Sequence, residues 1–500
     1  MLIEIKGLQD ERFLRPLQEI TNLFFEESKV TFKQAEEADY IADFTVKESD
    51  TVKVSVTLVH RETGRETLGV SEKEYLFPDK KEAIKQLKRT ISHAYLIAFQ
   101  EMTGIRQKWG FLTGIRPTKL MHRALRSGAT EEEAHHMLSS EYMITDEKIE
   151  LMKTIVRRQL DAVPDLYDLR KEVSIYIGIP FCPTKCAYCT FPAYAINPAK
   201  GSVNGFLAGL QYEMKEIGRY LKENGIGITT IYYGGGTPTS ITAEEMDELY
   251  AIMYEHFPNV EKVREITVEA GRPDTITPEK LAVLKKWNID RISINPQSYI
   301  DETLKAIGRH HSVQETIDKY HLAREMGMNN INMDLIIGLP GEGTKELGHS
   351  LNETEKLMPE SLTVHTLSFK RASEMTRNRQ KYKVADRDEV QKMMNMAEEW
   401  TAAHDYHPYY LYRQKNILGN LENVGYSKMG QESIYNIMIM EEQQSIIGIG
   451  CGAASKFIHP ETGKIEHFAN PKDPKSYNES FLHYTEKKIE IMSQLFKGAQ

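Results

Sequence analysis

The sequence predicts an α/β protein: a partial (β/α)6 TIM-like barrel with an α+β accessory domain before it and a mainly helical domain after it. From Lys171 onward, short apolar segments alternate with longer helical patterns, which is typical of a parallel sheet built from βα repeats. The texture of the sequence also changes near residue 165 and again after Lys370. We therefore expect domains at 1–165, 166–370 and 371–500.

The N-terminal region has its own mixed pattern. An alternating apolar segment, Val52–Leu58, predicts a strand, and Asp79–Met102 and Glu131–Leu138 predict helices. A chain of 500 residues is too long for one ordinary core. We therefore interpret this region as an accessory domain whose role the sequence does not reveal.

The central region contains the predicted barrel. Its expected strands are Val173–Ile179, Thr230–Tyr233, Glu265–Ala270, Arg291–Asn295, Ile331–Ile337 and Ser361–Ser368. Its expected helices are Val203–Lys222, Ala243–His256, Pro278–Trp287, Val313–Met326 and Lys345–Leu357. Thr242 and Thr277 stand where helix start signals are expected, each shortly before glutamate residues.

The C-terminal region begins with a helix rich in Met and charge, Asp388–His404. An aromatic run, Tyr406–Tyr412, and a glycine-rich segment, Ile446–Ser455, follow it. We interpret this region as a cap or a substrate-facing domain.

Composition restricts the class of protein. With 40% hydrophobic and 27% charged residues, the chain resembles ordinary globular proteins. Its net charge of -9 argues against broad electrostatic capture of nucleic acid. The N-terminus does not read as a secretory signal, and no apolar run approaches the roughly 20 residues that span a membrane. A cytoplasmic location is therefore expected.

Three of the four cysteines lie in one short stretch, as Cys182, Cys186 and Cys189. In a reducing compartment such a group indicates metal binding or catalysis rather than disulfides. Three thiolates can hold three corners of a [4Fe–4S] cluster and leave one iron open for a cofactor. The alternatives are a zinc site completed by Cys451 or a histidine, and a chance grouping. The paired elements usual for zinc are not present in the sequence.

Polar residues recur on one face of the expected barrel strands. Successive strand residues point to opposite faces. If the apolar residues meet the outer helices, the polar ones face the barrel interior, where packed barrels carry branched apolar residues. The inward-facing polar residues predicted in this way are Tyr176, Glu269, Ser293, Asn295, Gln297, Asn332 and Asp334. Buried carboxylates need partners, so we expect Glu269 and Asp334 to accept hydrogen bonds from a ligand or from Arg309.

A run of three glycines, Gly234 to Gly236, follows the second expected strand. Glycines let backbone groups approach a ligand closely. Without a P-loop lysine or dinucleotide spacing, phosphate binding is the poorer interpretation.

Several motifs together resemble a known family. They are Tyr176-x-x-x-Pro-Phe-Cys-x3-Cys-x-Tyr-Cys189, Gly-Gly-Gly-Thr-Pro-Thr, Val268-Glu269, Pro296-Gln297-Ser298, Gly308-Arg309 and Asn332-Met-Asp-Leu-Ile-Ile-Gly-Leu-Pro340. The chain resembles the radical S-adenosylmethionine (radical SAM) oxygen-independent coproporphyrinogen III oxidases, and its long N-terminal extension resembles the HemZ-type branch. The resemblance implies a radical SAM barrel that holds a [4Fe–4S] cluster and one or two SAM molecules.

The resemblance also implies roles for residues. Cys182, Cys186 and Cys189 would bind the cluster. Tyr176, Gly235 and Glu269 would bind the first SAM, and Tyr176 is the expected catalytic side chain. The other SAM-contacting positions would be Tyr188, Gly236, Thr237, Gln297, Arg309 and Asp334, in part for a second molecule. The implied reaction uses a 5'-deoxyadenosyl radical for oxidative decarboxylation of coproporphyrinogen III to protoporphyrinogen IX.

The sequence departs from the family pattern at three places, and these departures bear more on the identity of the substrate than on that of the cofactors. Gly178 replaces a usual histidine, Phe191 replaces a usual fourth cysteine, and the C-terminal His-Asn-x-x-Tyr-Trp element is not evident. Phe191 also resembles the haem-chaperone relatives. Cations suited to propionates flank the end of the barrel, at Lys370, Arg371, Arg413 and Lys415.

Three functions are therefore compared: an oxidoreductase of porphyrin and haem biosynthesis, a haem-binding chaperone, and a radical SAM enzyme that modifies RNA. The oxidoreductase would require a tetrapyrrole substrate and an electron donor such as flavodoxin or ferredoxin. The third is suggested by the mixed basic and aromatic stretch Arg106–Lys119.

Overall fold

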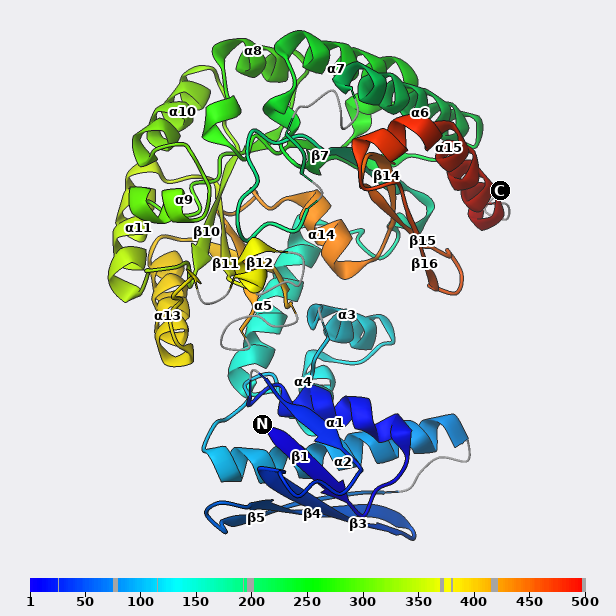
Figure 1. Cartoon of the computed structure of the whole chain (residues 1–500). Helices are drawn as coiled ribbons and strands as arrows, with labels where there is room; N and C mark the ends of the chain where they lie inside the picture. Colours follow the sequence, from blue (N-terminus) through cyan, green and yellow to red (C-terminus); the bar gives the residue numbers. More distant parts are fainter. Residues whose placement is uncertain are drawn as a thin grey trace. The chain divides into compact units, whose positions relative to one another are not determined.

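The computed structural model describes residues 1–25, 27–74, 80–114, 116–191, 193–195, 202–368, 373–378, 381–414 and 421–496 (Figure 1). The chain forms two compact units, Met1–Thr154 and Ile155–Gln500. Helix α5 (Asp146–Ala162) passes from the first unit into the second. The three-way domain division stays a prediction.

The first unit is a five-stranded sheet covered by helices. Its strands are β1 (Leu2–Lys6), β2 (Lys29–Thr31), β3 (Tyr40–Glu48), β4 (Thr51–His60) and β5 (Glu66–Glu74), in the order β2-β1-β3-β4-β5. Its helices besides α5 are α1 (Leu14–Thr21), α2 (Lys80–Thr103), α3 (Thr118–Arg126) and α4 (Glu131–Tyr142). The predicted strand and both predicted helices are confirmed.

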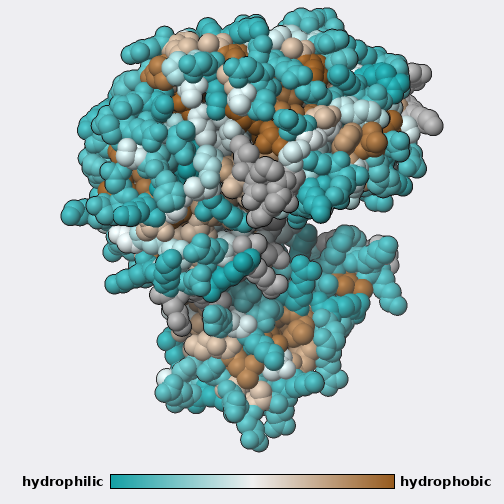
Figure 2. All heavy atoms as spheres, turned by 45° about the horizontal axis from the view of Figure 1, so that its top comes forward, coloured by the Kyte–Doolittle hydropathy of each residue, from teal (hydrophilic) through white to brown (hydrophobic). Residues whose placement is uncertain are grey.

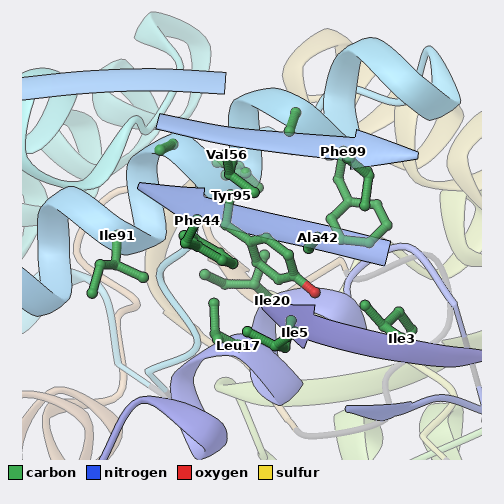
Figure 3. Packing of buried hydrophobic residues seen from close by; sticks show 14 of the residues in the cluster. Ile3, Ile5, Leu17, Ile20, Ala42, Phe44, Val56, Ile91, Tyr95 and Phe99 are labelled. Carbon is green, nitrogen blue, oxygen red and sulfur yellow. The ribbon is translucent and has the colours of Figure 1, made fainter. Parts of the chain in front are cut away.

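One face of this sheet packs against α1 and α2. Phe44 and Val56 from the sheet meet Leu17 from α1 and Tyr95 and Phe99 from α2 (Figure 3). These side chains are all buried. The unit therefore has a hydrophobic core of its own.

The second unit contains an 11-stranded sheet in the order β12-β13-β11-β10-β9-β8-β7-β6-β14-β15-β16. The strands that lie parallel to at least one neighbour are β6 (Val173–Ile179), β7 (Ile228–Gly235), β8 (Glu265–Val268), β9 (Arg291–Ser293), β10 (Ile331–Ile337), β11 (Ser361–Thr366) and β14 (Ser445–Gly450). The remaining strands are antiparallel: β12 (His407–Tyr412), β13 (Asn423–Ser427), β15 (Ala454–Ile458) and β16 (Ile465–Ala469).

Helices form an outer arc around the parallel strands (Figure 1). They are α6 (Val203–Glu223), α7 (Ala243–His256), α8 (Pro278–Lys286), α9 (Asp301–Ala306), α10 (Val313–Glu325) and α11 (Thr344–Leu357). The later helices are α12 (Glu374–Arg377), α13 (Arg387–Ala403), α14 (Ile434–Glu441) and α15 (Pro474–Phe496). Thr242 caps the start of α7 with a capping box, since the Thr242 hydroxyl accepts from the Glu245 N–H and the Glu245 carboxylate accepts from the Thr242 N–H.

The barrel strands are found where the alternation predicts them, but three of them end earlier. β8 stops at Val268 instead of Ala270, β9 stops at Ser293 instead of Asn295, and β11 stops at Thr366 instead of Ser368. The residues just beyond β8 and β9 keep single backbone contacts with the neighbouring strands, since Glu269 N–H donates to Tyr233 C=O and Ile294 N–H donates to Asn332 C=O. Polar residues of the predicted site thus follow the carboxyl ends of parallel strands.

The C-terminal region completes the sheet at both edges. The aromatic run forms β12, which pairs with β13, and β13 pairs with β11. The glycine-rich segment forms β14, which lies parallel to β6, with Gly450 opposite Gly178. Residues 371–500 therefore contribute strands to the barrel sheet as well as helices.

The face drawn in Figure 2 is mainly hydrophilic, with apolar residues in small separate patches. Within the described ranges, no helix combines the length and the apolar character that crossing a bilayer requires.

Candidate functional site

The cysteine stretch forms a loop directly after β6. Two hydrogen bonds tie its backbone to other segments, from Cys182 N–H to Tyr194 C=O at 3.1 Å and from Ala187 N–H to Ile307 C=O at 2.9 Å, and one within the loop joins Cys189 N–H to Cys186 C=O at 3.1 Å. These hydrogen bonds hold the backbone from which the three thiols project.

The surroundings of the thiols are polar on one side. The Cys182 sulfur lies 3.1 Å from the Thr237 hydroxyl. Burial raises the pKa of the Cys182 thiol to about 11, so the metal-free thiol stays protonated and metal binding would release its proton. Among the described residues, no group of three or more His, Cys, Asp or Glu side chains is arranged to hold a single metal ion.

The glycine run lies against the cysteine loop. Gly235 has a φ of 109°, in the region that favours glycine. A side chain at Gly236 would place its Cβ 2.5 Å from the Phe181 carbonyl oxygen. Gly236 N–H donates to Ile179 C=O, and Thr237 N–H donates to Phe181 C=O. The glycines are therefore required for close packing on the cysteine loop, a reason that the sequence alone did not suggest.

Glu269 lies beside a stack of tyrosines inside the barrel. The Tyr232 hydroxyl donates to Glu269 Oε1 at 2.5 Å. The Tyr232 ring lies 6.1 Å from the Tyr176 ring and 4.3 Å from the Tyr435 ring, measured between centroids. Burial raises the pKa of Glu269 to about 7, against the lowering effect of the Tyr232 hydrogen bond. Tyr176 and Glu269, which the alternation of side chains along the strands predicts to face inward, thus lie on the same side of the barrel interior.

A row of buried polar atoms along β9 and its continuation has no partner. Among the described residues, Ser293 Oγ, Asn295 Oδ1 and Gln297 Oε1 are buried without a hydrogen bond. Buried polar atoms are normally satisfied, so a polar ligand along this row would supply what the protein lacks. Gln297 also has a φ of 67°, a conformation that is costly for a residue other than glycine. It is held there because its N–H donates to Asp334 C=O and its C=O accepts from Ile336 N–H.

The guanidinium group of Arg309 lies beside this row and is held there by hydrogen bonds. One terminal nitrogen donates at 2.8 Å to both the Gly271 and the Asn295 carbonyls, and the other lies 3.4 Å from the Tyr188 hydroxyl. Its buried Nε has no hydrogen-bond partner among the described residues. The predicted contact of Arg309 with a carboxylate is not observed, because the guanidinium binds backbone carbonyls instead.

Asp334 stays a carboxylate in the barrel interior. Burial would raise its pKa, but hydrogen bonds from His365 and Asn332 hold the pKa below its usual value. Asn332 Nδ2 lies 2.8 Å from Asp334 Oδ1, and His365 Nε2 lies 3.5 Å from Oδ2. Glu269 and Asp334 therefore differ: near neutral pH the first is poised to titrate and the second is ionised.

Several residues of the site were not predicted from the sequence. Tyr435 comes from α14, whose first turn binds the Glu265 carboxylate through the Ser433 hydroxyl and two backbone N–H groups. Arg272 contacts the cysteine loop. His311 is buried with neither ring nitrogen bonded within the described chain, and burial with two nearby arginines lowers its pKa to about 3. The sequence feature that could have identified Arg272 as a site residue is its position as a charged residue shortly after the end of a predicted strand.

The departures from the family pattern have structural consequences. A side chain at Gly178 would place its Cβ 2.8 Å from the Cys451 carbonyl oxygen, so this position in β6 is closed to larger residues. Phe191 is 54% exposed.

The predicted cations are only partly described. Arg413 is buried, and burial lowers its pKa to about 10. Lys370, Arg371 and Lys415 lie outside the described residues.

Comparison with known proteins gives consistent similarities. A family model of the radical SAM superfamily matches residues 176–353. The chain is 66% identical over 503 residues to the oxygen-independent coproporphyrinogen-III oxidase-like protein HemZ of Bacillus subtilis (strain 168), covering 99% of each chain. It is 30% identical over 330 residues to the heme chaperone HemW of the same strain, covering 65% of this chain and 82% of HemW.

Among solved structures, coproporphyrinogen III oxidase (HemN) from Escherichia coli matches with a TM-score of 0.51. The match covers 68% of this chain and 74% of HemN at 19% sequence identity. At that identity the similarity concerns the fold, and it supports the radical SAM barrel.

Proposed function

The chain belongs to the family of the oxygen-independent coproporphyrinogen-III oxidase-like protein HemZ, and from this premise we propose that it is a radical SAM oxidoreductase that acts on coproporphyrinogen III. Membership of the radical SAM superfamily means that a [4Fe–4S] cluster and S-adenosylmethionine are its cofactors. When bound, they supply a carbon-centred radical that abstracts hydrogen from a substrate.

The observation that best supports SAM binding is the row of unpartnered polar atoms beside the cysteine loop. Cys182, Cys186 and Cys189 would hold the cluster. The oxygens of Asn295 and Gln297 and the Arg309 Nε are buried and without partners in the described chain. A ligand with an amino acid part, ribose hydroxyls and an adenine offers both donors and acceptors to this row.

The two carboxylates would have different tasks. Asp334, whose pKa is held low, would accept hydrogen bonds as an anion over the whole neutral range. Glu269, with a pKa of about 7, would accept from an ammonium or hydroxyl group when ionised. The tyrosine stack of Tyr176, Tyr232 and Tyr435 would exclude water from this side of the cavity.

The proposed reaction converts two propionate groups into vinyl groups. Each propionate loses CO2, one hydrogen atom and one electron, so the reaction also needs an electron acceptor for each vinyl group formed. An electron donor, such as flavodoxin or ferredoxin, is needed to reduce the cluster. The product would be protoporphyrinogen IX.

The test is anaerobic reconstitution of the cluster, followed by addition of SAM, a reductant and coproporphyrinogen III. Chromatography should detect 5'-deoxyadenosine, methionine and protoporphyrinogen. Cys186→Ala should lose the cluster and SAM cleavage, whereas Cys451→Ala, a control outside the loop, should keep both. SAM cleavage without a porphyrin product would reject the substrate and leave the radical chemistry intact.

A haem chaperone is the second candidate, because the chain is 30% identical to a protein named heme chaperone HemW. Haem titration of the cluster-loaded protein separates the two candidates. Stoichiometric haem binding without turnover of coproporphyrinogen III would favour the chaperone.

The RNA-modifying candidate loses its main support. In the stretch Arg106–Lys119, Trp109 is 1% exposed, and the Phe111 ring packs 5.2 Å from His93 and 6.0 Å from Tyr142. Base recognition by stacking requires exposed aromatic faces. Trp109 is buried, and Phe111 is partly buried against the core of the first unit.

A further inference from the structure

A buried arginine, Arg272, is paired with the more exposed Asp274 after the carboxyl end of β8, close to the cysteine loop. Arg272 is 3% exposed. Its Nε and Nη2 donate to the two oxygens of Asp274 at 3.0 and 2.8 Å. A two-point contact between a guanidinium and a carboxylate fixes the direction of the guanidinium plane as well as its position.

The third nitrogen of Arg272 points at the cysteine loop. Its Nη1 donates to the Thr184 hydroxyl at 2.9 Å and lies 3.9 Å from the Cys186 sulfur. Thr184 is held in turn, since its hydroxyl donates to the Gly308 carbonyl at 3.1 Å. The cation is therefore connected to the loop at a cysteine and at a residue between two cysteines.

The contacts of the other site residues differ from this one. Cys182 meets the neutral hydroxyl of Thr237. Arg309 uses one terminal nitrogen on backbone carbonyls and the other on Tyr188. His311 is kept neutral near pH 7, because burial lowers its pKa to about 3. Arg272 thus brings a permanent positive charge to the sulfur of a predicted cluster ligand.

We propose that Arg272, oriented by Asp274, is a positioning residue that donates a charged hydrogen bond to Cys186 and raises the reduction potential of the cluster. The proposal rests on the ligand role of the three cysteines but not on the identity of the substrate. It deepens the proposed function by naming what adjusts the electron-accepting step.

The physical reason is the change of charge on reduction. A one-electron reduction adds negative charge to the cluster, and this charge spreads over its sulfur ligands. A nearby cation and a hydrogen bond to a ligand sulfur both favour the reduced state. Because Arg272 is buried, water screens this interaction less than it would at the surface.

The test is a redox titration of the reconstituted holoprotein, followed by the electron paramagnetic resonance signal of the reduced cluster. Arg272→Gln should shift the midpoint to a more negative potential. We expect at least a tenfold fall in the reduced-to-oxidised ratio at a fixed potential, which is about 59 mV for a one-electron couple. Arg272→Lys keeps the charge without the fork and should shift the midpoint less.

Asp274→Asn should shift the midpoint potential in the opposite direction to Arg272→Gln. A purely structural role of the ion pair would not produce shifts of opposite sign. Asp274→Asn removes a negative charge while Arg272 keeps Thr184 and Cys186 as partners, so the midpoint should become more positive. The matched control is Arg264→Gln, since Arg264 forms a two-point pair with Asp165 at 2.7 and 2.6 Å in the same unit. Its midpoint should equal that of the wild type.

Two outcomes would overturn the proposal. One is a midpoint for Arg272→Gln equal to that of Arg264→Gln at full iron content. The other is a shift of Asp274→Asn in the same direction as Arg272→Gln. Iron and sulfide content, measured for each variant, separates a change of potential from a failure to bind the cluster. A protein that shows these shifts without oxidising coproporphyrinogen III would support the Arg272 proposal and reject the substrate.

Discussion

At the scale of single residues, the site combines groups whose ionisation the fold has shifted. Glu269 has a raised pKa and Asp334 a lowered one, although both are carboxylates in the same interior. Burial acts to raise the pKa of both groups, and for Glu269 the hydrogen bonds from Tyr232 and the Gly235 backbone offset it only in part. For Asp334 the hydrogen bonds from His365, Asn332 and Thr363 outweigh burial and bring the pKa below its usual value. The partners therefore decide the direction of each net shift.

Glu269 should make stability depend on pH. Its pKa rises from 4.5 to about 7 on folding, so the folded state binds more protons than the unfolded state between these values. Below pH 4.5 the raised pKa of Glu269 does not lower the free energy of unfolding, and between pH 4.5 and about pH 7 it lowers this free energy increasingly. In the cofactor-free protein, Glu269→Gln should raise the free energy of unfolding by up to roughly 3 kcal/mol at pH 8.

Thermal unfolding at pH 5 and at pH 8 checks this expectation. The stabilising effect of Glu269→Gln should be largest at pH 8 and should shrink at pH 5. An effect of equal size at both values would contradict a shifted pKa.

Gly178 should not tolerate a side chain. Gly178→Ala would place a Cβ 2.8 Å from the Cys451 carbonyl oxygen and 3.3 Å from the Ala453 Cβ, at a cost of about 1–3 kcal/mol. The control is Gly348→Ala in α11, where the nearest atom within reach is Met396 Cε at 3.6 Å. That change should stabilise the protein by about 0.5–1 kcal/mol. Thermal melts of the two variants should therefore move in opposite directions.

At the scale of elements, the last helix is tied to the barrel through one buried pair. Lys488 of α15 and Glu213 of α6 are fully buried and form a salt bridge. Glu213 also accepts from the Gly450 N–H at 2.7 Å and from the Tyr477 hydroxyl at 2.8 Å. Lys488 donates to the Gly448 carbonyl. These contacts hold α15 and α6 to strand β14, which lies beside β6.

Lys488→Met should destabilise the second unit by about 3–5 kcal/mol, because it leaves a buried carboxylate without its cation. Adding Glu213→Gln, which removes the second charge but keeps an acceptor, should recover part of the loss. Lys356→Met, in an exposed pair with Glu353, should cost less than about 1 kcal/mol. Denaturant unfolding gives all three values. A double variant no more stable than Lys488→Met would contradict a charge effect.

At the scale of the whole molecule, the chain consists of two units with separate cores. The first unit packs α1 and α2 on its own five-stranded sheet. All the predicted site residues belong to the second unit. Cofactor binding should therefore depend on the second unit alone.

A fragment of residues 146–500, which begins at the start of α5, should fold and reconstitute the cluster. Its iron content and SAM affinity should match those of the full chain within about twofold, since the first unit contributes none of the predicted site residues. Absorbance of the cluster and calorimetric titration with SAM measure both. A fragment that folds without taking up iron would show that the first unit takes part in the site.

Much of the barrel could be predicted from the sequence, because period-2 apolar patterns and helix start signals are local. The bounds of β6, β10 and α7 match the predicted ones. The predicted ends of β8, β9 and β11 were too late, since the alternation of apolar and polar residues continues past the point where regular strand pairing stops. The cysteine group, the glycine run and the polar face were also visible, because each is a pattern of near neighbours along the chain.

The sequence by itself therefore determined the barrel, the three thiols of one loop and the family to which they point. Only the tertiary structure decided that strands after residue 371 complete the sheet, that Gly178 is closed by Cys451, and that Arg272 reaches Cys186. These facts depend on contacts between residues tens to hundreds of positions apart. No local pattern encodes such a contact, because packing and charge act through space rather than along the chain.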